Sequence, residues 1–364
     1  MGKNRVCIVS LSAYPLLTRQ NIEIVGGAEL QSVLLARELA KRNFNVSFIV
    51  TDHGQGSPQI IDGIRVIKSY PINTPVGIRF STVRLIWRAL SEADADIYYG
   101  FRGIAGIVAF YCLIRRRKLV IGIPSDMEVE EKRASKANIY NWLWRFDLKI
   151  ANSVITQTKY QQEMLEKRFG RNSVIIKAFH LIEDKKIEKA KPPIVLWVST
   201  IRPQWKQPEV FLKLAIAVPE GRFQMVGGPS GDKKFYQRIK EQAIKIPNLD
   251  FVGFVPHHEV YTYFEKASIF ANTSDVEGFP NTFLEAWSRC TPVVSLNIDP
   301  DEIICDHKLG LHSKSFEQMV KDVKSLLVDG DLRRELGENG RRYVEQEHEL
   351  KSVVDQYVEL FRQL

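Results

Sequence analysis

The stretch that decides the fold is Asn272-Thr-Ser-Asp-Val-Glu-Gly-Phe-Pro-Asn-Thr-Phe-Leu-Glu-Ala-Trp-Ser-Arg289. Apolar, strand-like runs lie on both sides of it, at 267–271 and 292–296. Gly278 and Pro280 within it are typical of a turn that leads into a helix. A strand, a turn, a helix and a second strand form the unit of a parallel α/β layer. The stretch therefore predicts an α/β fold.

The turn in this stretch has the features of an anion site. The free amides of a helix's first turn, together with the helix dipole, favour a phosphate. Glu277 lies in the turn, and Glu285 lies one helical turn after Asn281 on the same face. Both carboxylates could accept hydrogen bonds from hydroxyls beside that phosphate, as a nucleotide sugar would offer. A plain helix N-terminus with nearby acidic residues explains the pattern equally well.

The spacing Glu277-x7-Glu285, in the string EGFPNTFLE, resembles the signature of the retaining family 4 (group 1) glycosyltransferases, which have the GT-B fold. This resemblance implies two Rossmann-like, doubly wound α/β domains that face each other across a cleft. It also implies that Glu277 holds the hydroxyls of the donor sugar and that Glu285 holds the ribose. The other donor-binding residues that it implies here are Gly278, Phe279, Pro280 and Asn281.

Strand-like and helix-like segments alternate along the whole chain, whose 364 residues are enough for two α/β domains. A charged segment at 183–191 separates two such series. We interpret it as the interdomain linker, and it could at the same time be a solvated surface loop. We predict an N-terminal acceptor-binding domain at 1–185 and a nucleotide-sugar-binding domain at 186–348. By resemblance, the last segment, 349–364, is a helix that crosses back to the first domain.

The composition is that of a globular protein, and together with the charge it narrows the class of protein. The net charge of +8 suits an anionic partner, and no recognisable nucleic-acid-binding motif accompanies it. The N-terminus leads straight into a strand rather than a signal peptide, and the longest apolar segment, 103–114, is too short to span a bilayer. Four cysteines without metal-ligand spacing indicate reduced thiols. We therefore expect a cytoplasmic protein without a nucleic-acid partner.

Two cations follow the first strand of the second domain, in Thr200-Ile-Arg-Pro-Gln-Trp-Lys206. Arginine binds phosphate oxygens through two donors and lysine acts as a point charge, so the pair suits a diphosphate leaving group. The spacing Arg202-x3-Lys206 resembles the family pattern, in which these residues neutralise the departing nucleoside diphosphate. They would take the electrostatic role of a metal, so we predict no metal and no cofactor. Asp94 and Asp96 spell a DxD pair, but they lie in a solvated turn at the wrong end of the sheet.

Three further loops resemble donor-binding segments of the family. Gly228 lies in a glycine-rich turn after the second strand of this domain. Phe254 and Val255 follow the third strand, where relatives contact the nucleobase through backbone groups. Gly26 and Gly27, in the string GGAEL, resemble the first-domain loop that approaches the donor phosphate and the acceptor from across the cleft. The alternative for the first and last of these segments is a plain turn before a helix.

Asp126 is a further catalytic candidate. It follows the strand at 119–123, where many family members carry a histidine or an aspartate close to the donor sugar. No histidine is present here, which departs from the commonest pattern. Asp126 could bind a donor hydroxyl, or Ser125 could merely cap a helix.

Clustered cations in the first domain point to an anionic lipid surface. They form the runs 115–118 and 132–136, and Trp142 and Trp144 follow. Each cluster alone is more typical of a solvated face. The two together predict peripheral contact with an anionic membrane, at its inner face.

These features predict a retaining glycosyltransferase that moves a hexose from a UDP- or GDP-sugar to a hydroxyl of a glycan or lipid-linked acceptor, in cell-surface polysaccharide or glycoconjugate synthesis. Two alternatives remain open. One is a GT-B sugar-nucleotide epimerase, with acidic groups such as Asp126 and Glu128 as its acid and base. The other is a non-catalytic nucleotide-sugar-binding subunit, against which the presence of Lys206, Glu277 and Glu285 argues.

Overall fold

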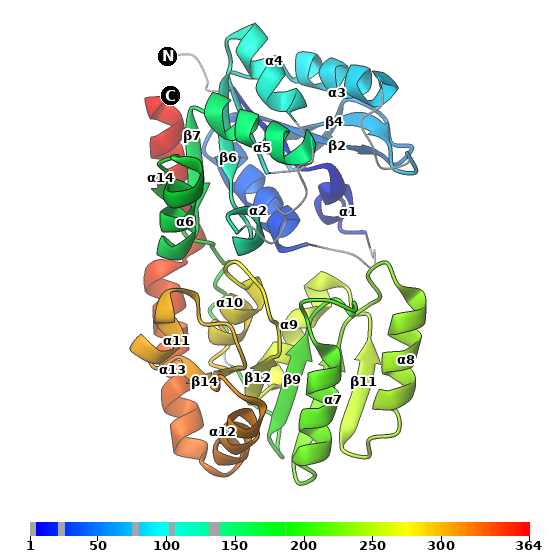
Figure 1. The fold of residues 1–364 in the computed structure, drawn as a ribbon, viewed down its shortest axis with the longest axis vertical. Coiled ribbons are helices and arrows are strands. Elements are labelled where there is room, and N and C mark those ends of the chain that lie inside the picture. The colour runs from blue at the N-terminus through cyan, green and yellow to red at the C-terminus, as the bar shows by residue number, and fades with distance from the viewer. Residues whose placement is uncertain (1–4, 21–25, 75–79, 102–105, 131–138, 186) are drawn as a thin grey trace. The chain divides into compact units, whose positions relative to one another are not determined.

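The chain folds into two compact α/β units, each built on its own sheet (Figure 1). The computed structural model describes residues 5–20, 26–74, 80–101, 106–130, 139–185 and 187–364. The described residues of unit 1 belong to Met1–Gln20, Val25–Ala178 and Lys351–Leu364, and those of unit 2 to Phe179–Leu350.

Unit 1 contains an eight-stranded sheet in the order β3-β4-β2-β1-β5-β6-β7-β8. Neighbouring strands are parallel, except that β3 pairs with β4 in antiparallel fashion. The sequence predicted each described strand of this sheet except β3, whose three residues are too few to show a periodic pattern. The strands are β1 (Arg5–Val9), β2 (Asn45–Asp52), β3 (Gln59–Ile61), β4 (Ile64–Pro71), β5 (Ile97–Phe101), β6 (Lys118–Gly122), β7 (Ser153–Thr156) and β8 (Val174–Ile175).

The order of the strands reverses at β1 and β5, because the chain leaves β1 toward β2 and returns on its other side with β5. Ligands of doubly wound sheets bind beyond the carboxyl ends of the strands at such a switch point. The helices that cover this sheet are α1 (Tyr14–Leu17), α2 (Gly27–Lys41), α3 (Phe80–Ala93), α4 (Ile107–Arg115), α5 (Ile139–Ile150) and α6 (Lys159–Phe169).

The last helix of the chain, α14 (Leu350–Gln363), supplies part of the core of unit 1. The ring of Tyr357 meets the ring of Tyr99 on β5 edge to face, with centroids 5.9 Å apart, and Phe361 is also buried against Tyr99. Arg42, at the end of α2, donates hydrogen bonds to the Asp355 carboxylate and to the Lys351 carbonyl. Apolar packing and these polar contacts together hold the helix on this unit.

Unit 2 contains a six-stranded parallel sheet in the order β11-β10-β9-β12-β13-β14. The sequence predicted its described strands except β14. That strand begins at Gly310, where a Cβ atom would collide with the Val293 carbonyl, and a glycine at a strand start gives no apolar signal. The strands are β9 (Ile194–Val198), β10 (Arg222–Val226), β11 (Leu249–Gly253), β12 (Ile269–Asn272), β13 (Val293–Ser295) and β14 (Gly310–His312).

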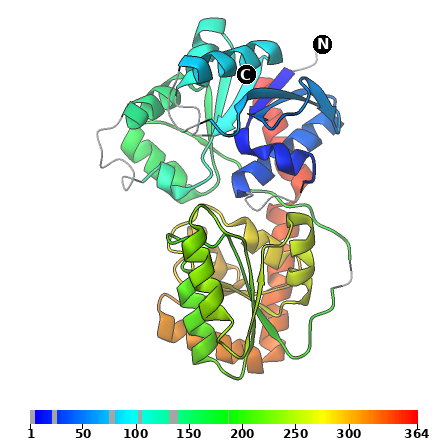
Figure 2. The same cartoon turned by 90° about the vertical axis from the view of Figure 1, so that its right-hand side faces the viewer.

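Helices lie on both sides of this sheet (Figure 2). Its strands read as continuous apolar runs because both faces are covered. Trp197, Phe211 and Phe223 are fully buried near the centre of the core. The helices are α7 (Pro208–Ala217), α8 (Lys233–Ala243), α9 (His257–Lys266), α10 (Asn281–Trp287), α11 (Ile303–Asp306), α12 (Phe316–Val328) and α13 (Gly330–Glu347).

The charged segment 183–191 lies along unit 2. Lys189 Nζ donates to the carbonyls of Phe264 and Arg289, at 3.2 and 2.7 Å, and to Thr291 Oγ1 at 2.6 Å. Burial lowers the pKa of the Lys189 amine to about 7. Lys189 therefore joins α9 to the turn after α10, whereas Glu183, Asp184, Lys185, Glu188 and Lys191 of the same segment are exposed.

We expect Lys189→Met to lower the free energy of unfolding by about 2 kcal/mol or more, since a buried acceptor that loses its donor costs about 1–3 kcal/mol. Urea unfolding measures this change. Lys185→Met is the matched control, because Lys185 forms an exposed ion pair with Glu265 and such pairs contribute about 1 kcal/mol or less. Equal effects of the two substitutions would contradict the assignment.

Candidate active site

Four loops of unit 2 carry most of the predicted donor-binding residues. They follow β9, β10, β11 and β12, which are the four neighbouring strands at one side of the parallel sheet. The carboxyl ends of parallel strands lie at one edge, where ligands of such sheets bind. The fold therefore brings residues between 199 and 285 of the sequence to a single edge.

The loops after β9 and β12 are joined by a chain of hydrogen bonds. Trp197 Nε1, in the core, donates to Thr273 Oγ1 at 2.9 Å. Thr273 Oγ1 in turn donates to the Lys206 carbonyl at 2.8 Å. The amide of Asp275 donates to the Trp205 carbonyl at 2.7 Å. Two hydrogen bonds from the loop after β12 thus hold the backbone at Trp205 and Lys206.

The backbone on either side of Lys206 is strained. Trp205 has a φ of 67° and Gln207 a φ of 49°, both in the left-handed region. Non-glycine residues rarely adopt this conformation, which costs about 1–3 kcal/mol and persists only where surrounding contacts enforce it. Here the enforcing contacts are the hydrogen bonds to Thr273 and Asp275. This backbone conformation fixes the direction in which the side chain of Lys206 projects from the loop.

Lys206 and Glu277 form an ion pair. Nζ of Lys206 contacts Oε1 of Glu277, and only 16% and 15% of the two side chains are exposed. The Arg202 guanidinium lies over the ring of Trp205, 4.8 Å from its centroid, which keeps a second cation in the same loop. The structure therefore brings together a cation predicted to bind the diphosphate and the carboxylate predicted to bind the sugar.

Glu285 also has a basic partner. Its side chain is 5% exposed, and Oε1 lies 3.2 Å from Nε2 of His257, the first residue of α9. The sequence did not single out His257 as a site residue. The two residues are 28 positions apart and meet only because α9 packs against α10, so no local pattern reveals the pair.

A buried aromatic and basic cluster lies behind His257. The His257 ring meets the ring of Tyr261 edge to face, with centroids 5.1 Å apart. The Arg289 guanidinium lies 4.3 Å from the centroid of Tyr261, and its Nη1 lies 3.3 Å from Nε2 of His180. Burial, followed by the charge of Arg289, lowers the pKa of His180 to about 3. His180 is therefore neutral at physiological pH.

The turn before α10 leads into the helix as the sequence predicted. Pro280 occupies the N-cap position and Asn281 is the first helical residue. Phe279 is buried, and its ring packs on His348 with centroids 4.8 Å apart. At this residue, therefore, only the backbone could contact a donor. Gly278 is buried in the same turn.

The glycine-rich turn after β10 is constrained at a position that the sequence did not single out. A Cβ atom at Gly227 would collide with the Ser199 carbonyl, so glycine is required there. Gly228 is buried, and its carbonyl accepts a hydrogen bond from the Ile201 amide at 2.9 Å. This pairing extends β9 and β10 toward the site. Phe254 and Val255 are partly buried and lead from β11 toward α9.

The other predicted site residues belong to unit 1. Gly26 caps α2, and the Glu29 carboxylate folds back so closely that a Cβ atom at Gly26 would collide with it; Gly27 is exposed. Asp126 Oδ1 accepts a hydrogen bond from Gln161 Nε2 at 2.9 Å, while Ser125 accepts one from the Met127 amide. Ser125 is thus a cap, as one reading had it, and Asp126 is held by a buried glutamine.

Asp94 and Asp96 are not in a plain solvated turn. Arg5 and Arg117 bind both carboxylates, and the Arg5–Asp94 and Arg117–Asp94 contacts are each 2.6 Å. The arginines come from the start of β1 and from the residue before β6, so the network ties together the amino ends of neighbouring strands. This is the edge opposite to the one at which ligands bind, which agrees with the rejection of a DxD site.

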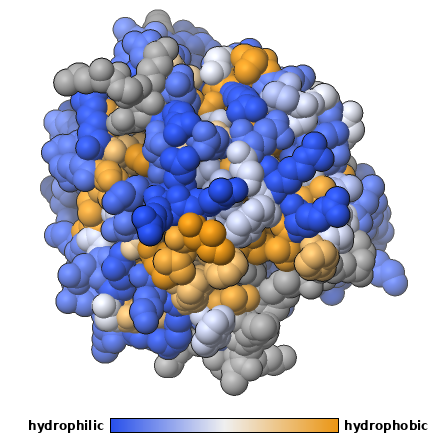
Figure 3. All heavy atoms as spheres, turned by 90° about the horizontal axis from the view of Figure 1, so that it is seen from above, coloured by the Kyte–Doolittle hydropathy of each residue, from blue (hydrophilic) through white to orange (hydrophobic). Residues whose placement is uncertain are grey.

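The predicted membrane-binding residues are only partly at the surface. Trp142 on α5 is 65% exposed, whereas Trp144 is buried and Arg117 is engaged in the network above. The cluster at 132–136 lies outside the described residues. Figure 3 shows apolar side chains gathered among hydrophilic ones on the face that includes α3 and α4. No helix among the described residues is long and apolar enough to cross a membrane.

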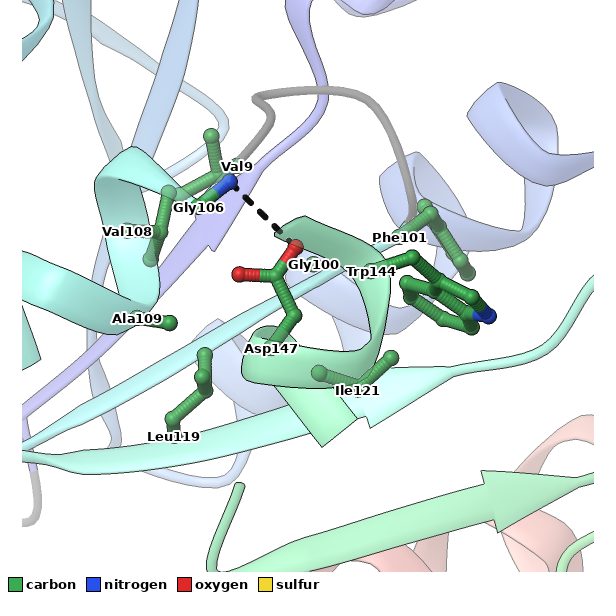
Figure 4. A pocket seen from close by; sticks show the side chains of 10 residues that line it. All are labelled: Val9, Gly100, Phe101, Gly106, Val108, Ala109, Leu119, Ile121, Trp144 and Asp147. Atoms are coloured by element: carbon green, nitrogen blue, oxygen red, sulfur yellow. Dashed lines mark hydrogen bonds between the residues drawn. The ribbon is translucent and has the colours of Figure 1, made fainter. Parts of the chain in front are cut away.

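Unit 1 contains a pocket between its sheet and helices α4 and α5 (Figure 4). Its lining is mainly apolar and includes Val9 and Phe101 from the carboxyl ends of β1 and β5. Asp147 of α5 is the one charged lining residue, and its Oδ2 accepts a hydrogen bond from the Gly106 amide at 3.3 Å. The pocket therefore lies at the switch point of this sheet, with a carboxylate fixed at its wall.

Residues 25–177 match the family described as Glycosyltransferase Family 4, and residues 179–343 match the family described as Glycosyl transferases group 1. The two matches follow each other along the chain and correspond to the two units. The chain belongs to the group 1, family 4 glycosyltransferases.

Comparison with individual proteins agrees with this assignment. An uncharacterized glycosyltransferase from Haemophilus influenzae is 22% identical over 353 residues, which cover 93% of this chain and 96% of that protein. A sucrose-phosphate synthase from Thermosynechococcus elongatus is similar in structure, with a TM-score of 0.82 and 17% identity over 99% of both chains. Anabaena HepE in complex with UDP-glucose has a TM-score of 0.78 and 17% identity over 99% of both chains. The predicted GT-B fold is confirmed.

We expect His180 to make stability depend on pH. Its pKa is about 3 in the folded protein and 6.5 as a free side chain, so the unfolded state takes up the proton first as the pH falls. The stabilisation is fully present above 6.5 and is lost toward 3, at about 1.4 kcal/mol per pH unit. Urea unfolding at about pH 7 and about pH 5 should show a smaller difference for His180→Asn than for the wild type. His258→Asn, at an exposed site, should keep the wild-type difference; if His180→Asn keeps it too, the buried neutral state is wrong.

Proposed function

We propose that the protein is a retaining hexosyltransferase that uses a nucleotide diphosphate sugar and a hydroxyl acceptor and needs no metal for the transfer. The observation that carries this proposal is the ion pair of Lys206 and Glu277 at the carboxyl edge of the unit 2 sheet. A diphosphate brings negative charge that competes with Glu277 for Lys206. Binding of the donor would therefore place the cation on the diphosphate and release the carboxylate for the sugar hydroxyls beside it.

Arg202 and Lys206 would stabilise the departing diphosphate. In the transfer, the bond from the anomeric carbon to the diphosphate oxygen breaks, and the acceptor oxygen bonds to that carbon on the same face. The acceptor's proton passes to the leaving phosphate oxygen. Charge develops on the diphosphate as the bond breaks, so fixed cations there lower the barrier. The strained backbone around Lys206 supports this role, because it holds the cation in place before the donor binds.

Glu285 would bind the ribose. A carboxylate accepts hydrogen bonds from both ribose hydroxyls, and His257 keeps the side chain oriented in the absence of the donor. Backbone groups at Phe254 and Val255 would contact the nucleobase, and those at Gly228 and from Gly278 to Asn281 would lie against the diphosphate and sugar. The UDP-glucose bound to HepE supports UDP-sugars as the first donors to test. Gly26, Gly27 and Asp126 would contribute from unit 1.

We expect one class of UDP-, GDP- or ADP-sugar to raise the melting temperature of the protein, and Lys206→Ala to reduce kcat by about 100-fold or more. The physical reason is the loss of a positive charge aimed at the leaving group. Thermal-shift screening identifies the donor, and a coupled assay for the released nucleotide measures turnover. The anomeric configuration of the product, determined by NMR, tests retention.

Lys213→Ala is the matched control, because Lys213 is an exposed lysine of α7 in the same unit. It should leave turnover unchanged. Near-normal turnover of Lys206→Ala would show that the diphosphate role is misassigned. Sugar conversion without an acceptor would favour the epimerase, and nucleotide binding without any turnover would favour the binding subunit. No stabilisation by any nucleotide sugar would contradict the whole proposal.

A lipid-linked acceptor at a membrane surface is supported by the outer faces of α3, α4 and α5. Phe110, Leu113 and Ile114 on α4 are about half exposed, and Trp142 on α5 is more exposed still. Exposed cations on or beside the same helices are Arg84, Arg88, Arg115, Arg116, Arg145 and Lys149. The apolar side chains would enter the head-group layer while the cations meet anionic lipids. Two of these helices, α4 and α5, also line the small, mainly apolar pocket of unit 1.

We expect the protein to sediment with vesicles that contain anionic phospholipid and to remain in the supernatant with neutral vesicles. The variant Phe110→Ser/Trp142→Ser should bind anionic vesicles at least about tenfold more weakly, because two apolar side chains no longer enter the lipid. Co-sedimentation at physiological salt measures the binding.

Ile216→Ser/Val328→Ser provides the control, since these apolar side chains are exposed on unit 2. Its binding should equal that of the wild type. Equal loss in both double variants, or equal binding to neutral and anionic vesicles, would argue against a membrane-binding face on unit 1.

A further inference from the structure

We propose that Asp299, Cys305 and His312 form a binding site for a divalent transition metal of the zinc type on unit 2. A carboxylate oxygen, a thiol sulfur and an imidazole nitrogen from these residues all lie within 4.8 Å of one another. The three residues take no part in the proposed transfer of sugar. The inference therefore stands independently of the proposed function.

The topology of the sheet assembles this cluster. β13 and β14 are parallel neighbours, paired from Val293 with Gly310 to Ser295 with His312. Asp299 lies in the loop that follows β13, and His312 is the last residue of β14. Cys305 comes from α11, between the two strands. Spacings of six and seven residues with three different residue types match no common metal motif, so the site could not be recognised from the sequence.

Asp299 provides the observation that points to a ligand. Its side chain is 3% exposed, and Oδ1 accepts a hydrogen bond from the Ile304 amide at 2.8 Å. Oδ2 is buried and has no hydrogen-bond partner in the described part of the chain. It lies 3.7 Å from Nδ1 of His312. A buried carboxylate oxygen without a donor is costly, and a cation between these two atoms would remove that cost.

The ligand atoms select the class of metal. Thiolate and imidazole suit zinc and its neighbours in the first transition row, whereas magnesium and calcium prefer oxygen alone. Three protein ligands leave the fourth tetrahedral position for water or a small ligand. Cys305 is exposed, which gives the metal a route to the site.

Metal binding would stabilise a strained loop. Asp301 and Glu302, between Asp299 and Cys305, have positive φ values of 52° and 60°. In the same loop, Asn297 Nδ2 donates to Asp275 Oδ1 at 3.0 Å, and Asp275 also binds Gln207 beside Lys206. A metal at Asp299 would therefore hold a loop that contacts the candidate donor site, while remaining separate from it.

The site is tested by titrating the metal-free, full-length protein with cobalt(II), whose spectrum reports its ligands. We expect one cobalt per chain, with a thiolate-to-cobalt charge-transfer band in the near ultraviolet and visible bands typical of tetrahedral geometry. Zinc should displace the cobalt and raise the melting temperature. Absence of the charge-transfer band at stoichiometric cobalt would overturn the proposal.

Variants assign the ligands. Cys305→Ser should abolish the charge-transfer band, and Asp299→Asn and His312→Gln should each weaken binding about tenfold or more. Cys290→Ser is the matched control, since Cys290 is a second free cysteine outside the cluster, and it should keep the band. The melting temperature of metal-free Cys305→Ser should equal that of the wild type, because the residue is exposed. A band that survives in Cys305→Ser or disappears in Cys290→Ser would exclude this site.

Discussion

The hydroxyl of Thr273 is the contact on which the candidate donor site depends. It accepts a hydrogen bond from the buried indole of Trp197 and donates one to the carbonyl of Lys206. The first partner belongs to the core of unit 2, and the second belongs to the loop that carries the cations. The packing of β9 against β12 therefore sets the position of Lys206. This link stabilises the left-handed backbone conformation of Trp205 and Gln207, which is unfavourable unless surrounding contacts enforce it.

Both carboxylates predicted to bind hydroxyls have a basic neighbour. Lys206 forms an ion pair with Glu277, and Oε1 of Glu285 lies 3.2 Å from Nε2 of His257. The Lys206–Glu277 pair keeps two partly buried charges from being left without a partner, which would be costly. A diphosphate sugar, the proposed donor, offers both phosphate oxygens and hydroxyls and could exchange partners with this pair.

Two different groups of polar side chains lie along one edge of the unit 2 sheet. The loops after β9 and β12 carry the Lys206–Glu277 pair, while the loop after β13, α11 and the end of β14 bring together Asp299, Cys305 and His312. Asn297 and Asp275 join the two regions by a hydrogen bond. Loops at the carboxyl ends of parallel strands can vary without disturbing the sheet, because the strands are held by their own ladder and by the helices on both faces.

The sequence by itself determined the two α/β series, most strands, and the loops that carry Arg202, Lys206, Glu277 and Glu285, because apolar periodicity and short motifs are local. It missed β3 and β14, which are too short or begin with glycine. Only the tertiary structure decided that Phe279 turns into the core, that His257 meets Glu285, and that Asp299 meets His312. These contacts join residues on different strands and helices, and their distances depend on how the elements pack. The stretch 272–289 therefore predicted the turn and helix that carry Glu277 and Glu285, and only packing determined that Lys206 and His257 lie beside them.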